Sequence, residues 1–276
     1  MKLCYNGLTT KYATLLQDLN AAANAGFDSL ELREDKLADY LVENSMQSLI
    51  DLLKEKNLTV CTINSIEITQ QQAQGIKHDE IMDKLTWMCD MAQQLGADSL
   101  ITAPLFNDNE WTKEQNKEFL VGLYHEMSDI AAKYDVRLCF EIIAHTTAMV
   151  PNLATALEII EAIDRDNVGL CFDCFAFYGN ESKLETIAKI QPDKLFMVHI
   201  NDARVGIDKI NLGEQDRRFP GEGEIDLKSV LSEIKKLGYD GAFSTELITP
   251  HVWEWDVQEA VTRAYETTKK VVSEVY

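Results

Sequence analysis

The stretch VGLCFD, residues 168–173, carries five apolar or small residues in succession and then a single carboxylate, Asp173. Such a short and almost wholly apolar run is typical of a strand that other elements cover on both faces, as in a parallel sheet. Similar runs recur along the chain at KLCYNGL (2–8), SLELR (29–33), TVCTIN (59–64), DSLITAP (98–104), RLCFEI (137–142), LFMVHI (195–200) and GAFSTEL (241–247). The chain therefore contains eight candidate strands of one kind, spread over its whole length.

Amphipathic stretches with helical spacing separate these runs, for example at residues 230–237. A glycine stands at three helix-to-strand junctions, Gly26, Gly96 and Gly238, where it suits the left-handed C-cap of a helix. Asp226 is a candidate N-cap of the helix that follows it. Eight strand–helix units in 276 residues match the number of units and the length of a TIM barrel. We therefore predict an α/β fold, a single (β/α)₈ TIM barrel that spans residues 1–276. The alternative is an open doubly wound sheet, which usually has fewer strands, and no GxGxxG motif follows the first run here.

Composition restricts the partners. The chain has 26 lysines and arginines against 46 aspartates and glutamates, a formal net charge of −20. A strongly acidic surface repels nucleic acid and anionic membrane, so we expect neither as a partner. The six cysteines form no CxxC motif, and the N-terminal segment lacks a long apolar region, so we expect reduced thiols in a cytoplasmic protein.

Four consecutive strands end in side chains that bind metal ions. In a parallel barrel the carboxyl ends of all strands meet at one face, so Glu141, Asp173, His199 and Glu246 should converge there. Four such groups would repel one another or lie unpaired unless a cation were among them. Three carboxylates and one imidazole suit one divalent ion, Zn²⁺, Mn²⁺, Mg²⁺ or Co²⁺.

This ligand set predicts a reaction class. A divalent ion that holds two oxygens of a hydroxy ketone stabilises the enediolate formed when a proton leaves the adjacent carbon. Glu141 and Glu246 would approach that carbon from opposite sides, one as the base and one as the acid. The sequence therefore predicts isomerisation or epimerisation of a small polyhydroxy ketone without an organic cofactor. Asn6 and Arg33, near the ends of the first two strands, could bind such a polyol or could cap a loop.

The pattern of strand ends resembles the sugar phosphate isomerase/epimerase superfamily with a xylose-isomerase-like barrel, and within it the inosose (2-keto-myo-inositol) isomerase family. The segments that carry the resemblance are MKLCYNGLTT (1–10), ELREDKLADYL (31–41), RDNVGLCFD (165–173), HIND (199–202), DRRFPGEGEIDL (216–227) and STELITP (244–250). The resemblance implies the same four metal ligands, substrate contacts from His145 and Arg217, and a place for Asp202 close to the metal. It also implies a role in carbohydrate metabolism, specifically inositol catabolism, and a homodimer or homotetramer. Relatives commonly carry Asp-x-x-His after the sixth strand, whereas this chain has Ala176 at the histidine position.

Three alternatives stay within the superfamily. A ketose 3-epimerase or a 3-dehydroshikimate-type dehydratase would use the same ligands, so the ligands do not separate them. A DNA-repair endonuclease would need several zinc ions and a basic face for phosphates. The chain has only five histidines and a net charge of −20, and both observations argue against this alternative. The last alternative, a sugar-binding barrel without catalysis, is suggested by Ala176.

Overall fold

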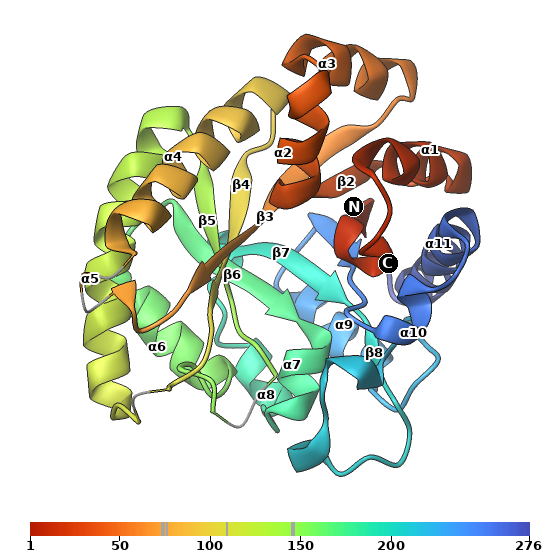
Figure 1. Cartoon of the computed structure of the whole chain (residues 1–276). Coiled ribbons are helices and arrows are strands. Elements are labelled where there is room, and N and C mark those ends of the chain that lie inside the picture. Colours follow the sequence, from red (N-terminus) through yellow and green to blue (C-terminus); the bar gives the residue numbers. More distant parts are fainter. Residues whose placement is uncertain (73–74, 76, 109, 145–146) are drawn as a thin grey trace.

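The structure is a computed structural model that describes residues 1–72, 75, 77–108, 110–144 and 147–276. Eight parallel strands close into a barrel in the order β1-β10-β7-β6-β5-β4-β3-β2, with helices around the outside (Figure 1). The barrel strands are β1 (Lys2–Asn6), β2 (Ser29–Arg33), β3 (Thr59–Ile68), β4 (Ser99–Pro104), β5 (Arg137–Glu141), β6 (Val168–Asp173), β7 (Leu195–Ile200) and β10 (Ala242–Thr245). All eight predicted strands are present, and the predicted TIM barrel is confirmed.

Helices follow the strands and shield their outer faces. They are α1 (Leu15–Ala25), α2 (Glu34–Glu43), α3 (Met46–Glu55), α4 (His78–Leu95), α5 (Lys113–Ala131), α6 (Leu153–Ile163), α7 (Cys174–Gly179), α8 (Leu184–Ile187), α9 (Leu227–Lys236), α10 (Pro250–Trp253) and α11 (Val257–Ser273). Short 3₁₀ turns lie at Gly7–Thr10, Ala132–Tyr134, Pro192–Lys194, Lys209–Asn211 and Glu214–Asp216. The first and last long helices, α1 and α11, pack against each other, so the helical ring closes where the barrel closes (Figure 1).

The predicted helix ends are confirmed where the structure describes them. Gly26 and Gly96 cap α1 and α4 in the left-handed conformation, with φ of 100° and 71°. Asp226 caps the start of α9 by accepting a hydrogen bond from the backbone N–H of Ser229. The two glycine C-caps turn the chain from α1 and α4 back into the barrel, and the Asp226 cap fixes where α9 begins.

The barrel interior is layered. One layer is an apolar cluster, contributed by Cys4, Ile101, Cys139, Cys171, Met197 and Ala242. Side chains alternate between the two faces of a strand, so the residue two positions further on also points inward, one layer higher. On β5, β6 and β7 that residue is Glu141, Asp173 and His199, respectively. The apolar layer is thus the floor of a polar cup at the carboxyl ends of the strands.

Two local features differ from the predicted elements. The connection that follows β7, residues 201–225, contains a small antiparallel ribbon of β8 (Asp202–Ala203) and β9 (Arg217–Arg218), which was not predicted from the sequence. Strand β3 also runs four residues beyond the predicted end at Asn64, past an irregularity in its pairing with β4 between Ile63 and Ile66.

All six cysteines are free thiols. Among the described residues, no helix combines the length and apolar character that crossing a membrane requires.

Candidate metal centre

The four predicted ligand residues come together at the carboxyl end of the barrel. One atom each from Glu141, Asp173, His199 and Glu246 can be chosen so that all four atoms lie within 4.8 Å of one another, and all four residues are buried. His199 is central. Its Nδ1 lies 2.7 Å from Oε1 of Glu141, 3.4 Å from Oε2 of Glu246 and 4.0 Å from Oδ2 of Asp173. We call these four residues the quartet.

Strand register accounts for this convergence. Asp173 on β6 pairs with His199 on β7, and His199 pairs with Ser244 on β10, two residues before Glu246. Glu141 on β5 pairs with Cys171, two residues before Asp173. Neighbouring parallel strands therefore bring their last inward-facing residues to nearly one height, as a barrel with all strands in one direction requires.

Asp173 is held in place by donors from three segments. Its Oδ1 accepts a hydrogen bond from the backbone N–H of Ala176 at 2.6 Å, which makes Asp173 the N-cap of α7. Its Oδ2 accepts bonds from Asn201 Nδ2 at 2.9 Å and from Arg217 Nη1 at 2.8 Å. Ala176, at the position where the resemblance implies a histidine, thus supports Asp173 through its backbone, and its buried side chain adds no polar group to the cup.

Glu246 is held from the other side of the cup. Its Oε1 accepts a hydrogen bond from Asn6 Nδ2 at 2.9 Å and a longer one from Asn64 Nδ2 at 3.4 Å. Its Oε2 lies 3.6 Å from Arg217 Nη1. Two asparagine amides therefore hold one carboxylate oxygen, and the guanidinium of Arg217 lies near the other.

Arg217 reaches the quartet from the loop between β7 and α9. Besides Asp173, its guanidinium pairs with Glu214 through Nε and lies 4.7 Å from the centre of the Phe175 ring. Burial alone would lower the pKa of Arg217, but the carboxylates of Asp173, Glu214 and Glu246 raise it well above its ordinary value. The arginine is a fixed positive charge on the rim of the cup.

A fourth carboxylate, missed in the sequence, faces the quartet from β2. Glu31 is fully buried, and its two oxygens lie 3.1 Å and 3.0 Å from His199 Nε2, the ring nitrogen that points away from Glu141. The sequence does contain a signal for it. Glu31 is the only charged residue in the interior of the run SLELR, and a charged side chain inside an apolar strand needs a partner.

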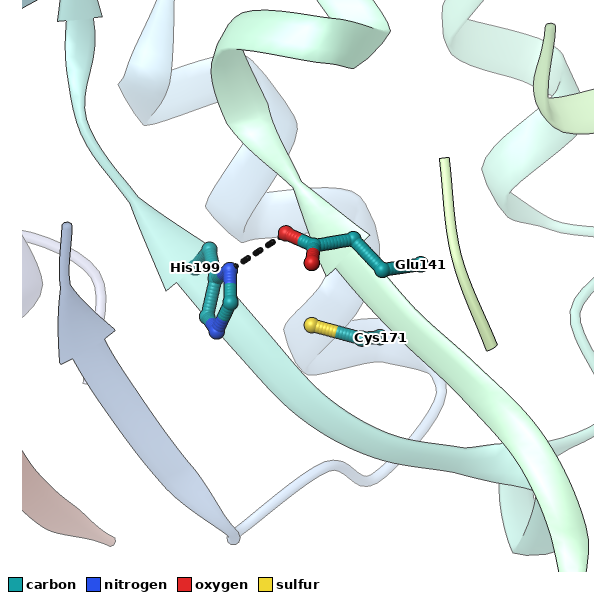
Figure 2. Close-up of side chains that lie close together, drawn as sticks. All are labelled: Glu141, Cys171 and His199. Carbon is teal, nitrogen blue, oxygen red and sulfur yellow. Dashed lines mark hydrogen bonds and ion pairs between the residues drawn. The ribbon is translucent and has the colours of Figure 1, made fainter. Parts of the chain in front are cut away.

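Cys171 lies beneath Glu141 and His199, and the three side chains converge in Figure 2. Burial raises the pKa of the Cys171 thiol well above its ordinary value, so the thiol is neutral at physiological pH. It therefore adds no negative charge to a site that is already rich in carboxylates.

The environment separates the two glutamates of the quartet. Burial, together with the charges of Glu246 and Asp173, raises the pKa of Glu141 to about 7 against the opposing effect of His199. Burial would also raise the pKa of Glu246, but His199 and Arg217 outweigh it and lower that pKa below its ordinary value. Two carboxylates whose pKa values are driven apart are the arrangement that acid–base catalysis uses.

The residues present fit a divalent cation. Four carboxylates, Glu31 and the three of the quartet, are buried around one arginine and one imidazole, so the cup has an excess of negative charge that a cation would neutralise. Oxygen and imidazole nitrogen donors suit Zn²⁺ and Mn²⁺, and ligand bonds of about 2.0–2.2 Å require donor atoms as close together as these are.

Four predicted site residues remain: Asn6, Arg33, Asp202 and His145. Asn6 lies in the cup, on Glu246, whereas Arg33 lies behind it, on Asn64 Oδ1 at 3.0 Å and near Glu34 and Asp35. Asp202 is engaged elsewhere, because its carboxylate accepts backbone N–H groups at 203, 221, 223 and 225 and so folds the loop between β9 and α9. These contacts give Asp202 a structural role in the loop, and its predicted place close to the metal stays a prediction. His145 lies outside the described residues.

Comparison with known proteins agrees with this site. The inosose isomerase of Halalkalibacterium halodurans is 33% identical over 99% of this chain and 97% of its own length. A solved structure of the IOLI protein with a bound zinc atom superimposes with a TM-score of 0.95 at 32% identity, covering 100% of this chain and 99% of the other. The 3-dehydroshikimate dehydratase of Pseudomonas putida is 26% identical over 85% of this chain but only 36% of its own length. The family model of the xylose isomerase-like TIM barrel matches residues 19–270, and the chain belongs to that family.

Proposed function

We propose that the chain is a divalent-metal-dependent isomerase of a small cyclic polyhydroxy ketone of the inosose type. Glu141, Asp173, His199 and Glu246 hold the metal, and Glu141 and Glu246 carry the proton. The observation that carries the proposal is the buried quartet, with its donor atoms within 4.8 Å, in a chain similar over its full length to an inosose isomerase.

The metal, when bound, supplies Lewis acidity that stabilises negative charge developing on the oxygens of the substrate. The residues of the chain supply the proton transfer. Burial and the neighbouring carboxylates raise the pKa of Glu141 to about 7 before a metal binds, which favours a role in taking and returning a proton near neutral pH. Glu246, held ionised by His199 and Arg217, is ready to act as the base. A proton leaves the hydroxyl-bearing carbon and is returned to the former ketone carbon, while the hydroxyl proton passes to the former ketone oxygen. The ketone thereby moves by one position, and nothing is oxidised or reduced overall.

Arg217 is the substrate contact that the structure supports best. Two of its nitrogens pair with Asp173 and Glu214, and the guanidinium borders the quartet 3.6 Å from Glu246. Guanidinium donors in such a place can bind a ketone or hydroxyl oxygen and hold it beside the two glutamates. His145 stays a predicted substrate contact.

The test is solvent exchange in D₂O. With inosose and added Mn²⁺ or Zn²⁺, the enzyme should incorporate deuterium at the carbon next to the ketone, and chelation should stop the exchange. We expect Glu246→Gln to lose exchange by at least about 100-fold, the order that a positioned acid or base contributes. Glu158→Gln, on the outer surface of α6 and paired there with Lys113, is the matched control and should exchange at the wild-type rate.

The metal content of each variant separates two causes of lost exchange. A Glu246→Gln variant that keeps its metal but does not exchange supports the proton-carrying role. A variant that keeps its metal and exchanges at the wild-type rate contradicts that role. Asp173→Asn should instead lose exchange together with metal.

The second candidate is a dehydratase or a ketose 3-epimerase, and the likeness to the dehydroshikimate dehydratase favours including it. Each of these reactions also begins with removal of a proton next to a carbonyl, so the same quartet would serve. Parallel assays with 3-dehydroshikimate, fructose and tagatose decide between them. Turnover of one of these, with none of inosose, would replace the proposed substrate.

We also propose that the enzyme works in the cytoplasm as a homodimer or homotetramer. Six free cysteines fit a reducing compartment. Light scattering of the purified chain tests the oligomer, and fluorescence of a tagged chain in its own cell tests the compartment.

A further inference from the structure

Glu31 is buried behind the histidine of the quartet and is not needed as a metal ligand. The ring of His199 stands between two acidic groups, with Nδ1 toward Glu141 at 2.7 Å and Nε2 toward Glu31 at 3.0 Å. The two nitrogens of an imidazole are distinct, and the partner of one decides what the other can do. Glu31 therefore acts on the quartet through the ring of His199.

The hydrogen-bond network indicates that Glu31 accepts hydrogen bonds on both carboxylate oxygens. Arg33 can only donate, and its Nη1 lies 3.0 Å from Asn64 Oδ1, so the amide of Asn64 must turn its Nδ2 donor toward Glu31 Oε1, at 2.7 Å. Ser244 Oγ donates to Glu31 Oε2 at 2.6 Å. With donors on both oxygens, Glu31 is an ionised acceptor, and the remaining partner, His199 Nε2, presents an N–H to it.

We propose that Glu31 is a positioning residue for the metal centre: by accepting the Nε2–H of His199 it leaves the lone pair of Nδ1 directed at the cation site between Glu141, Asp173 and Glu246. The inference rests on the proposed function, because it assumes that the quartet binds a divalent ion. A carboxylate on the outer nitrogen also makes the inner nitrogen a stronger donor.

The same carboxylate is connected to the second proton carrier. Asn64 Nδ2 lies 2.7 Å from Glu31 Oε1 and 3.4 Å from Glu246 Oε1, so one amide bridges the two glutamates. Strands β2 and β3 are paired, and Asn64 lies two positions beyond Thr62, the register partner of Glu31, whereas Glu246 follows β10. Loss of Glu31 would thus disturb both the histidine ligand and one support of Glu246, while Asn6 would still hold Glu246 at 2.9 Å.

A role in stability alone does not account for this arrangement. Burying a carboxylate costs free energy, and an apolar side chain would fill the position at lower cost unless the charge were required. Asp18 provides the comparison. It is an equally buried carboxylate, but its partners are Lys36 and Thr10, and none of the hydrogen bonds that the structure describes connects it to the quartet. Asp18→Asn therefore serves as the matched control for Glu31→Gln.

The test measures zinc affinity by competition with a chromophoric chelator, in wild type, Glu31→Gln and Asp18→Asn. Glutamine keeps the size of the side chain but carries no charge and places an N–H₂ group against Ser244, Asn64 or His199. We expect Glu31→Gln to bind zinc about 10- to 100-fold more weakly, and Asp18→Asn to bind it as the wild type does even where its thermal stability is lower.

A second measurement does not depend on how the variant folds. In zinc-loaded wild-type protein labelled with ¹⁵N-histidine, His199 should show a proton on Nε2 and the metal on Nδ1.

Ser244→Ala, which removes one donor from Glu31, should weaken zinc binding by a smaller factor than Glu31→Gln.

The outcomes separate this inference from the proposed function. Glu31→Gln protein that binds zinc as tightly as the wild type, or a wild-type spectrum with the metal on Nε2, overturns the role of Glu31 and leaves the isomerase intact. A wild-type chain that binds no divalent ion overturns both.

Discussion

Replacing Lys36 by methionine should destabilise the protein strongly, although Lys36 lies on α2 and is not part of the cup. Its Nζ donates to Asp18 Oδ2 at 2.6 Å, to the carbonyl oxygen of Gly7 at 2.7 Å and to that of Thr10 at 2.8 Å. Both charged side chains are almost fully buried, at 7% and 2% exposure. The ion pair therefore fixes the 3₁₀ turn Gly7–Thr10, which follows β1.

The magnitude follows from what methionine leaves behind. Removing one partner of a buried ion pair strands the other charge and costs about 3–5 kcal/mol. Asp18 can relieve part of this by taking up a proton, because burial already raises its pKa to about 6 with Lys36 beside it. An acid whose folded pKa is raised favours folding at low pH, and this contribution is lost as the pH rises through the folded pKa. The loss in Lys36→Met should therefore be greatest at pH 8 and smaller at pH 5.

The assay is urea unfolding followed by circular dichroism at both pH values, with thermal unfolding beside it. For a chain of this size each kcal/mol corresponds to roughly 2–4 °C, so the melting temperature should fall by on the order of 10 °C. Lys236→Met, in an exposed pair with Glu233, is the control and should cost about 0–1 kcal/mol. Lys36→Met combined with Asp18→Leu should recover most of the loss, because no stranded charge remains. A loss below about 1 kcal/mol at pH 8, or a loss as large at pH 5, would refute the reasoning.

Two further predictions concern packing and the metal. Gly169→Ala should lower the free energy of unfolding by about 1–3 kcal/mol, because a Cβ there would lie 2.6 Å from the carbonyl oxygen of Lys194 and from the ring of Phe196. Gly122→Ala, in an exposed turn of α5 with open space around it, should instead raise the free energy of unfolding by about 0.5–1 kcal/mol. Equal effects of the two variants in urea unfolding would contradict both expectations. Zinc at about 100 times its dissociation constant should stabilise the wild type by about 2.7 kcal/mol, which a rise in melting temperature would show. Asp173→Asn should remove this rise. An unchanged rise in that variant would mean that the metal binds elsewhere.

The barrel could be predicted because its strands are decided locally. A run such as VGLCFD is buried on both faces, so its composition alone marks it as a strand. The ribbon of β8 and β9 could not be found in this way, since two residues per strand give no period, and its pairing depends on loop contacts such as those of Asp202. The end of β3 was misplaced because polar Asn64 looks like a strand terminus, whereas an irregular pairing with β4 lets the strand continue.

The quartet could be predicted for a geometric reason that does not extend to Glu31. Its members end neighbouring strands β5, β6, β7 and β10, and neighbouring strands in one direction must bring their ends together. Glu31 lies on β2, which the closed barrel separates from β7 by β1 and β10 on the shorter side. Its contact with His199 spans the mouth of the barrel, so it depends on the barrel being narrow enough for opposite side chains to meet. Sequence patterns indicate which way a side chain faces but not how far across an enclosed space it reaches. The residues that adjust a metal ligand from the opposite wall are therefore the part of such a site that a structure must supply.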